Sequence, residues 1–174
     1  LSGLGGNDEL VGRGGADTLL GGDGEDTLDG GADGDTLDGG DDSDTASYFF
    51  STAGVTISLA DGTASGGWAE GDSLISSENV LGTEFVDAIT GDDADNSLSG
   101  DRGDDTLDGG EGDDTLSGGR GGDELIGGTG TDTADYSLSV DGINIDLAAG
   151  TASGGDAEGD TLDGIEVIEA SFQD

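Results

Sequence analysis

The chain contains no cysteine, histidine, proline or methionine, and the first two absences exclude whole classes of function. Without cysteine there can be no disulfide and no thiolate metal site. Without histidine there can be no HExxH zinc motif, no Ser-His-Asp triad and no Cys-His pair. We therefore expect no catalytic site within these residues, and any metal must be bound by oxygen atoms alone.

Basic residues are scarce as well. Lysine is absent, and three arginines, Arg13, Arg102 and Arg120, stand against 42 acidic residues, which gives a net charge of −39. Such a chain repels phosphate backbones and anionic lipid surfaces, so we expect neither nucleic acid nor an anionic membrane as a partner. No apolar run approaches the roughly 20 residues that span a bilayer, so no membrane span is expected.

Low hydrophobicity combined with high net charge is typical of disordered chains, and composition alone leaves an unfolded acidic tail as one interpretation. Hydrophobic residues make up only 30% of the chain and aromatic residues 4%. Compaction would require neutralisation of the carboxylates, which three arginines cannot supply. A multivalent cation could.

Glycine is abundant, at 39 residues, and it recurs in phase. Five blocks of nine residues fill 3–47 and six more fill 82–135; block two reads GRGGADTLL and block nine GGEGDDTLS. Position one is glycine in all eleven blocks, and position six is Asp in ten of them and Asn96 in the other. Position eight is Leu or Ile in nine blocks, with Ala46 and Ala134 closing the two arrays. Three columns in phase indicate a repeat architecture and not low-complexity drift.

The pattern resembles the RTX, or hemolysin-type calcium-binding, nonapeptide repeat G-G-x-G-x-D-x-U-x, where U is a large aliphatic residue. The resemblance implies an all-β fold: a right-handed parallel β-roll, or solenoid, in which two blocks form one coil and Ca²⁺ binds in the turns between stacked coils. The residue types suit this chemistry, because glycine turns can aim carbonyl oxygens at one point and calcium prefers about six to eight oxygen ligands.

For this chain, the resemblance implies that each block stacks on the second block after it and that about seven or more calcium ions bind. Blocks six and seven fit the motif least well, since Phe85 and Val86 occupy turn positions and Asn96 lacks a charge. The candidate ligands are the position-six side chains Asp8, Asp17, Asp26, Asp35, Asp44, Asp87, Asn96, Asp105, Asp114, Asp123 and Asp132, and the backbone of the turn glycines Gly12, Gly14, Gly21, Gly30, Gly39, Gly100, Gly109, Gly118 and Gly127.

A second, longer period links the arrays. Residues 48–81 recur after the second array at an offset of 88, so that Tyr48 matches Tyr136 and the alternating run 55–59 matches 143–147. Alternation of this kind predicts strands with one buried face. We expect this segment to continue the roll, to bury its Tyr, Phe and Trp68 side chains, and to offer Asp72 and Asp160 as further calcium candidates. Carbohydrate stacking on Trp68 is an alternative. The predicted units are 1–47, the first array; 48–81, the inter-array segment; 82–135, the second array; and 136–174, a second copy of the segment running into a new array.

The resemblance implies a calcium-binding structural module of a secreted or cell-surface protein. Such a module leaves the cell unfolded through a type I secretion apparatus and folds in millimolar calcium outside. Phe172-Gln173-Asp174 resembles the start of block six, which predicts a longer parent polypeptide. Two alternatives remain open: a non-catalytic appendage of a secreted protease, lipase or epimerase, and a self-associating spacer of an adhesin or surface layer. Ice binding by the outward threonines of position seven is a variant of the latter.

Overall fold

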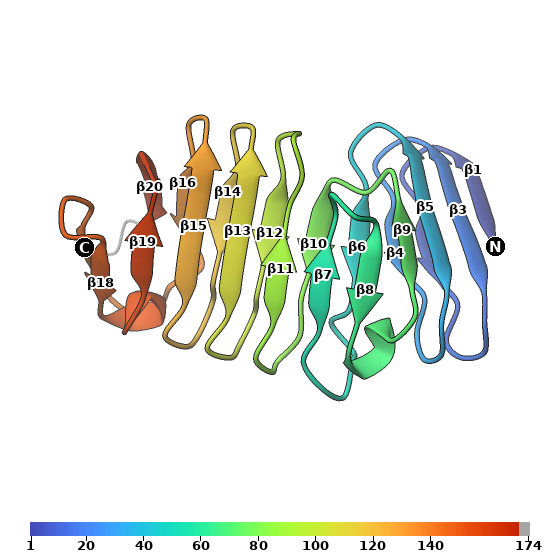
Figure 1. Ribbon diagram of the computed structural model, residues 1–174, viewed down its shortest axis with the longest axis horizontal. Helices are drawn as coiled ribbons and strands as arrows, with labels where there is room; N and C mark the ends of the chain where they lie inside the picture. Colours follow the sequence, from blue (N-terminus) through green and yellow to red (C-terminus); the bar gives the residue numbers. More distant parts are fainter. Residues whose placement is uncertain (171–174) are drawn as a thin grey trace.

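The structure is a computed structural model that describes residues 1–170, and its regular elements are short β-strands apart from two single turns of 3₁₀ helix, η1 (Gly67–Ala69) and η2 (Gly155–Ala157). The strands form a long sheet of twelve and a short sheet of eight, stacked along one axis (Figure 1). The all-β roll predicted from the repeats is confirmed. The segment that resembles a new array, 172–174, lies outside the described residues.

The long sheet runs, in spatial order, through β1 (Ser2–Gly5), β3 (Thr18–Asp23), β5 (Thr36–Asp41), β9 (Ser73–Ile75), β8 (Thr63–Ser65), β7 (Thr56–Ser58), β11 (Ala88–Thr90), β13 (Thr106–Glu111), β15 (Glu124–Thr129), β19 (Thr161–Asp163), β18 (Thr151–Ser153) and β17 (Asn144–Asp146). The short sheet runs through β2 (Glu9–Val11), β4 (Thr27–Asp29), β6 (Thr45–Ser47), β10 (Asn79–Leu81), β12 (Ser97–Ser99), β14 (Thr115–Ser117), β16 (Thr133–Tyr136) and β20 (Val167–Ala170).

Within the arrays each block pairs in parallel with the second block after it. Leu10 lies opposite Leu28 in the short sheet, and Leu19 lies opposite Leu37 in the long sheet. Because side chains alternate along a strand, position eight points inward while positions seven and nine point outward. The core is therefore a ladder of stacked aliphatic side chains with 0–8% exposure: Leu10, Leu19, Leu28, Leu37, Ala46, Ile89, Leu98, Leu107, Leu116, Leu125 and Ala134.

One roll passes through both arrays. The short sheet continues without a break from β6 through β10 to β12, and all these pairs are parallel. In the long sheet the inter-array segment inserts three strands, and the parallel pairing of the roll is interrupted here: β7 and β8 pair antiparallel, as do β8 and β9. The chain reverses at Gly62, whose φ of 62° lies in the left-handed region and whose N–H donates to the carbonyl of Leu59. The second copy repeats this hairpin with β17 and β18.

The aromatic side chains of the inter-array segments differ in burial, and Trp68, expected to be buried, is only half-buried. Tyr48 and Tyr136 are each 2% exposed, as expected, but Phe49 and Phe50 are 44% and 65% exposed, so their predicted burial is wrong. The chain turns directly after Tyr48, with the Ser51 N–H donating to the Tyr48 carbonyl. The tyrosine therefore points into the roll, while the two phenylalanines lie on the outside of the turn.

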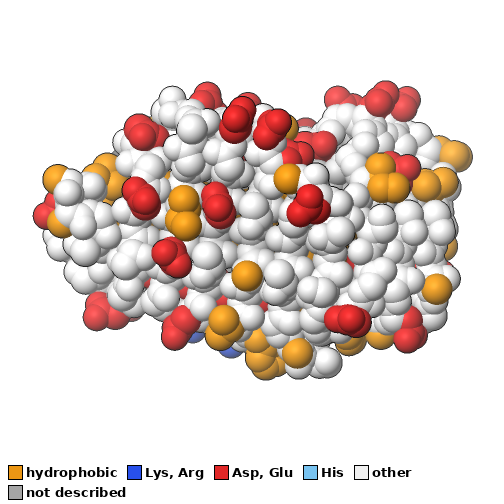
Figure 2. Space-filling view, viewed as in Figure 1, with side chains coloured by type: hydrophobic (Ala, Val, Ile, Leu, Met, Phe, Trp, Pro, Cys, Tyr) orange, Lys and Arg blue, Asp and Glu red, His pale blue; other side chains and the backbone are white. Residues whose placement is uncertain are grey.

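The surface is strongly acidic. Figure 2 shows red carboxylate groups scattered over the visible face, with blue guanidinium groups only at its lower edge. Among residues 1–170, no helix has the length and hydrophobicity needed to cross a membrane.

Removing a side chain from the aliphatic ladder should destabilise the roll. Leu116 is fully buried, so we expect Leu116→Ala to lower the free energy of unfolding by about 2–5 kcal/mol in saturating calcium, measured by urea denaturation. Leu138, at 85% exposure, provides the control, and Leu138→Ala should change the free energy by less than about 0.5 kcal/mol. Equal effects of the two substitutions would contradict this account of the core.

Candidate calcium sites

The position-six carboxylates tie consecutive coils together. In each array one carboxylate oxygen, Oδ1, accepts a hydrogen bond from the backbone N–H of the position-six residue 18 residues earlier. For example, the N–H of Asp8 donates to Asp26 at 2.7 Å, and that of Asp87 donates to Asp105 at 2.8 Å. The same bond, at 2.7–3.0 Å, joins Asp17 to Asp35, Asp26 to Asp44, Asn96 to Asp114, Asp105 to Asp123, and Asp114 to Asp132.

The second oxygen of these carboxylates has no such partner. Eight Oδ2 atoms are buried and accept no hydrogen bond from residues 1–170; they belong to Asp8, Asp26, Asp35, Asp44, Asp105, Asp114, Asp123 and Asp132. A buried polar atom without a partner is costly, and a charged one is more so. Eight repeats of the same unpaired atom therefore form a donor set at the coil edges that a cation would satisfy.

The position-one glycines border the same place. A Cβ atom added to Gly21 would collide with both Asp26 Oδ2 and the carbonyl oxygen of Gly39 in the next coil. At Gly12 it would lie 2.5 Å from the Gly30 carbonyl oxygen and 2.9 Å from Asp17 Oδ2. Carboxylate and carbonyl oxygens from successive coils thus converge where glycine leaves room. The same pair of oxygens surrounds Gly3, Gly100, Gly109 and Gly127.

Turn conformation completes the arrangement. Positions two and four adopt positive φ in blocks one to five and eight to eleven, which explains the motif G-G-x-G, since glycine reaches this region without strain. Where another residue stands there, it is forced into the same region, as with Arg13 (φ 81°) and Asp101 (φ 72°). Blocks six and seven are different: Thr83, Phe85, Asp92 and Ala94 all have negative φ, so their turns do not take the shape of the others.

Burial shifts the acidity of these carboxyl groups. Desolvation raises the pKa of Asp105 to about 7, and the pKa values of Asp114 and Asp123 to about 6, from an ordinary value of 3.8. The backbone hydrogen bond to Oδ1 opposes the shift in each case, and neighbouring carboxylates add to it. A bound divalent cation would reverse this balance and hold the groups ionised.

These atoms fit calcium. The donors are hard oxygens from carboxylates and backbone carbonyls, which is the ligand type that calcium selects. Among residues 1–170 no three acidic side chains converge in a geometry that could hold a metal, so the backbone carbonyls must complete each site. The unpaired Oδ2 atoms and the carbonyls beside the position-one glycines are the groups that would hold the ion.

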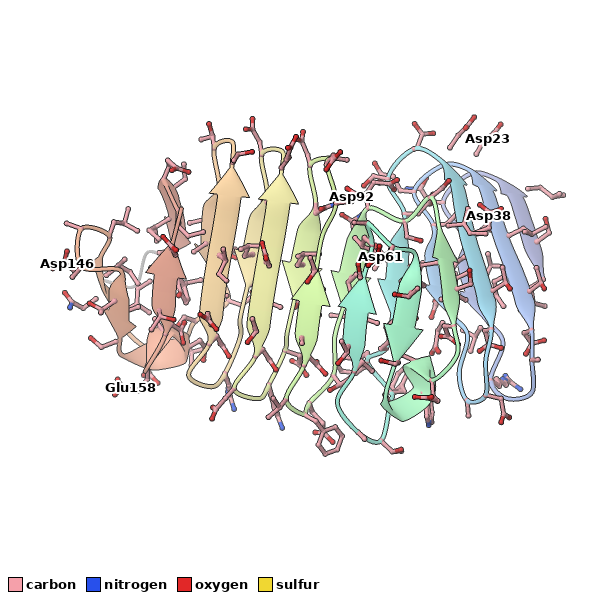
Figure 3. The ribbon with its side chains drawn as sticks, in the orientation of Figure 1. Asp23, Asp38, Asp61, Asp92, Asp146 and Glu158 are labelled. Carbon is pink, nitrogen blue, oxygen red and sulfur yellow. The ribbon has the colours of Figure 1, made fainter. Side chains whose placement is uncertain are left out.

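Both edges of the roll carry such columns, and Figure 3 shows carboxylates along each, with Asp23 near one edge and Glu158 near the other.

Most of the predicted aspartates take part, but three candidates differ. Asp87 accepts at Oδ2 from the Thr83 N–H at 2.6 Å and at Oδ1 from the Thr83 hydroxyl at 3.0 Å. Asn96 donates its amide N–H to the carbonyl of Glu78 at 2.9 Å. Asp17 is half-buried in the second block and is not among the eight buried unpaired groups.

Four acidic residues of the inter-array segments join the columns, and only two of them were anticipated. Asp72 and Asp160 accept the backbone N–H groups of Asp35 and Asp123, and their Oδ2 atoms accept the hydroxyl groups of Tyr48 and Tyr136. The side chains of Glu78 and Glu166 accept from Asp44 and Asp132. A sequence signal exists for Glu78, because it lies two residues before buried Val80, the same spacing as position six to position eight.

A sequence model of the RTX calcium-binding nonapeptide repeat matches the chain in four copies, at residues 2–37, 11–46, 81–116 and 99–134, which together cover more than half of its length. The chain belongs to the RTX family. Its repeats are calcium-binding structural repeats. No curated protein matches the chain.

Two glycines of one RTX block provide a test of the site geometry. Gly12→Ala places a Cβ against two site oxygens, whereas an added Cβ at Gly14 meets nothing within 4 Å. We expect Gly12→Ala to weaken calcium binding measurably in isothermal titration calorimetry, about tenfold for the ion at that turn, and Gly14→Ala to leave it unchanged. If both variants bound calcium like the parent, the turn glycines would not border the ion.

Neutralising a buried carboxylate should have opposite effects with and without calcium. The pKa of Asp105 is about 7 in the folded state and about 4 in the unfolded state, so the folded state binds the carboxyl proton more tightly. In chelator, the free energy of unfolding should therefore fall as the pH rises from about 4 to about 7. Acidification from about pH 7 to pH 5 should therefore increase the β signal in circular dichroism in chelator. In calcium it should weaken ion binding, because protons compete for the ligands.

The variant Asp105→Asn should reproduce both effects of acidification at pH 7. It should have more β structure than the parent in chelator and fewer bound ions than the parent in calcium. Exposed Asp93 offers a control of equal charge change, and Asp93→Asn should show a much smaller effect in both conditions. A loss of structure on acidification in chelator would contradict the assignment of Asp105 as a buried, unpaired carboxylate.

Proposed function

We propose that this chain is a calcium-operated structural module, unfolded in its two arrays at cytoplasmic calcium levels and folded in millimolar calcium outside the cell. The observation that carries the proposal is the set of eight buried carboxylate oxygens without a partner among residues 1–170. Stacking these coils without a cation would bury unpaired negative charge at every step. The fold of the arrays and the binding of calcium are thus the same event.

The thin core supports the same proposal. Each array coil of two blocks contributes only two fully buried aliphatic side chains, such as Leu107 and Leu116. Ordering each residue costs about 1–2 kcal/mol of backbone entropy, which so few apolar side chains cannot offset. Ions that bind only the folded form stabilise it through mass action, and several of them act together.

Export through a type I secretion apparatus and a location outside the cell follow from this proposal. An unfolded chain of net charge −39 can pass a narrow conduit, and calcium on the far side then traps it as a folded roll. The family is typical of secreted proteins, and the absence of cysteine suits a route that involves no disulfide formation. Calcium ions, the export apparatus and a longer parent polypeptide are the partners that the proposal requires.

A spacer role in a surface protein is the second candidate. The observation that favours it is the unbroken short sheet, which carries β2 through β20 along one axis and makes the two arrays a single rod-like body. A non-catalytic appendage of a secreted enzyme would use the same calcium chemistry but would not require this continuity.

The test is a calcium titration of the chelator-treated chain, followed by far-UV circular dichroism. We expect a cooperative gain of β signal at about 10⁻⁴–10⁻³ M calcium, the range of extracellular sites. Magnesium should fail to reproduce it, since it demands a stricter octahedral geometry. A β spectrum that persists unchanged in chelator would sink the proposal.

A further inference from the structure

Between the first array and the last four blocks of the second array lies a stretch of the roll in which no buried carboxylate oxygen lacks a hydrogen-bond donor. We call residues 48–99 the central band; it contains β7 to β12, including blocks six and seven of the second array, and it lies between residues 1–47 and 100–135 in Figure 1. None of the eight unpaired carboxylate oxygens belongs to it. At three edge positions, Asp72, Asp87 and Asn96, the central band supplies a hydrogen-bond donor of its own.

The clearest replacement is a tyrosine. Asp72 is 5% exposed and uses Oδ1 in the usual way, accepting the N–H of Asp35 at 2.8 Å. Its second oxygen, Oδ2, accepts the hydroxyl of Tyr48 at 3.0 Å, and that tyrosine is 2% exposed. The Tyr48 hydroxyl therefore satisfies the carboxylate oxygen that, under the proposed function, binds calcium in the arrays.

The second replacement is a threonine, and the third an amide. The Asp87 carboxylate accepts the N–H and the hydroxyl of Thr83 and also the N–H of Val55 at 2.8 Å. Asn96 carries no charge, and its amide donates to the Glu78 carbonyl. The turns of blocks six and seven accordingly lack the positive φ angles that shape the calcium turns.

The central band also buries more apolar side chains than the first array does. Its 52 residues bury ten apolar side chains: Tyr48, Val55, Ile57, Leu59, Ala64, Ala69, Leu74, Val80, Ile89 and Leu98. The 47 residues before it bury five, Leu10, Leu19, Leu28, Leu37 and Ala46. Acidic residues show the reverse trend, nine in the central band against thirteen in residues 1–47 and eleven in residues 100–135. The driving force for burial is greater here and the charge repulsion smaller.

From these observations we infer that the central band stays folded at calcium concentrations at which residues 1–47 and 100–135 are unfolded, and that it templates the refolding of both. Its outer strands offer the required edges: β9 and β10 pair with β5 and β6 of the first array, and β11 and β12 pair with β13 and β14 of the second. In a solenoid, each coil is stabilised by its neighbours, so a preformed coil lowers the cost of adding the next one. The inference rests on the proposed calcium-driven folding of the arrays.

The experiment is hydrogen–deuterium exchange of the full chain, read by mass spectrometry in chelator and in saturating calcium. We expect amides of residues 48–99 to exchange at least about tenfold more slowly than those of residues 1–47 and 100–135 in chelator, and all three regions to be protected in calcium. Trp68, the only tryptophan, lies within the central band, so its fluorescence should keep its folded value after the circular dichroism signal of the arrays is lost.

Two isosteric variants test whether the tyrosine hydroxyl is the cause. Tyr48→Phe leaves Asp72 Oδ2 without its donor, and we expect amides of β9 and β10 to exchange about tenfold or more faster in chelator. Tyr136→Phe removes the equivalent hydroxyl from Asp160 in the second copy and should leave residues 48–99 unaffected. Both variants must first show the parent's β spectrum in calcium.

The outcomes separate the inference from the function on which it rests. Free exchange of all regions in chelator, with uniform protection in calcium, would overturn the inference and leave the proposed function intact. Protection of all regions in chelator would overturn the proposed function as well. Equal exchange in Tyr48→Phe and the parent would show that the hydroxyl does not replace the ion.

Discussion

The structure depends on how one carboxylate divides its two oxygens. In seven position-six aspartates, one oxygen joins a coil to the backbone of the preceding coil, and the other is left buried and without a partner among residues 1–170. The first makes the stack regular, and under the proposed function the second makes it conditional on a cation. Glycine at position one, the left-handed residues at positions two and four, and the acidic composition all follow from building that edge repeatedly.

Salt bridges contribute almost nothing to neutralising this charge. Within the described residues, Arg102 lies 3.8 Å from Glu84 and Arg120 lies 3.7 Å from Asp156, and both guanidinium groups are mostly exposed. Exposed pairs of this kind contribute at most about 1 kcal/mol each. In residues 48–99, hydroxyl and amide donors of the chain itself satisfy edge oxygens. In the arrays, the proposed function assigns that part to calcium ions.

The array part of the fold could be predicted from the sequence because a nine-residue period fixes register, inward side chains and turn shape together. The pairing of Leu19 with Leu37 follows from that period alone. The inter-array segment is less predictable, since nothing in its alternation states whether a strand pairs parallel or antiparallel, and the exposure of Phe50 depends on a turn beginning one residue earlier. Tyr48 illustrates the limit: its burial was foreseen, but its hydrogen bond to Asp72 joins residues 24 apart and required the structure.

The lengthwise hydrogen bonds between coils determine how the molecule responds to force. Each array coil is bonded only to its two neighbours, through strands and side chains that recur every 18 residues. Tension applied to one end of an array is thus borne by the outermost coil alone, and coils detach one after another in equal increments of chain length. The antiparallel pair β7 and β8 interrupts that sequence, because its strands are consecutive in the chain and load each other directly. Unfolding under force that starts in one array therefore reaches the antiparallel β7–β8 pair before it reaches the other array.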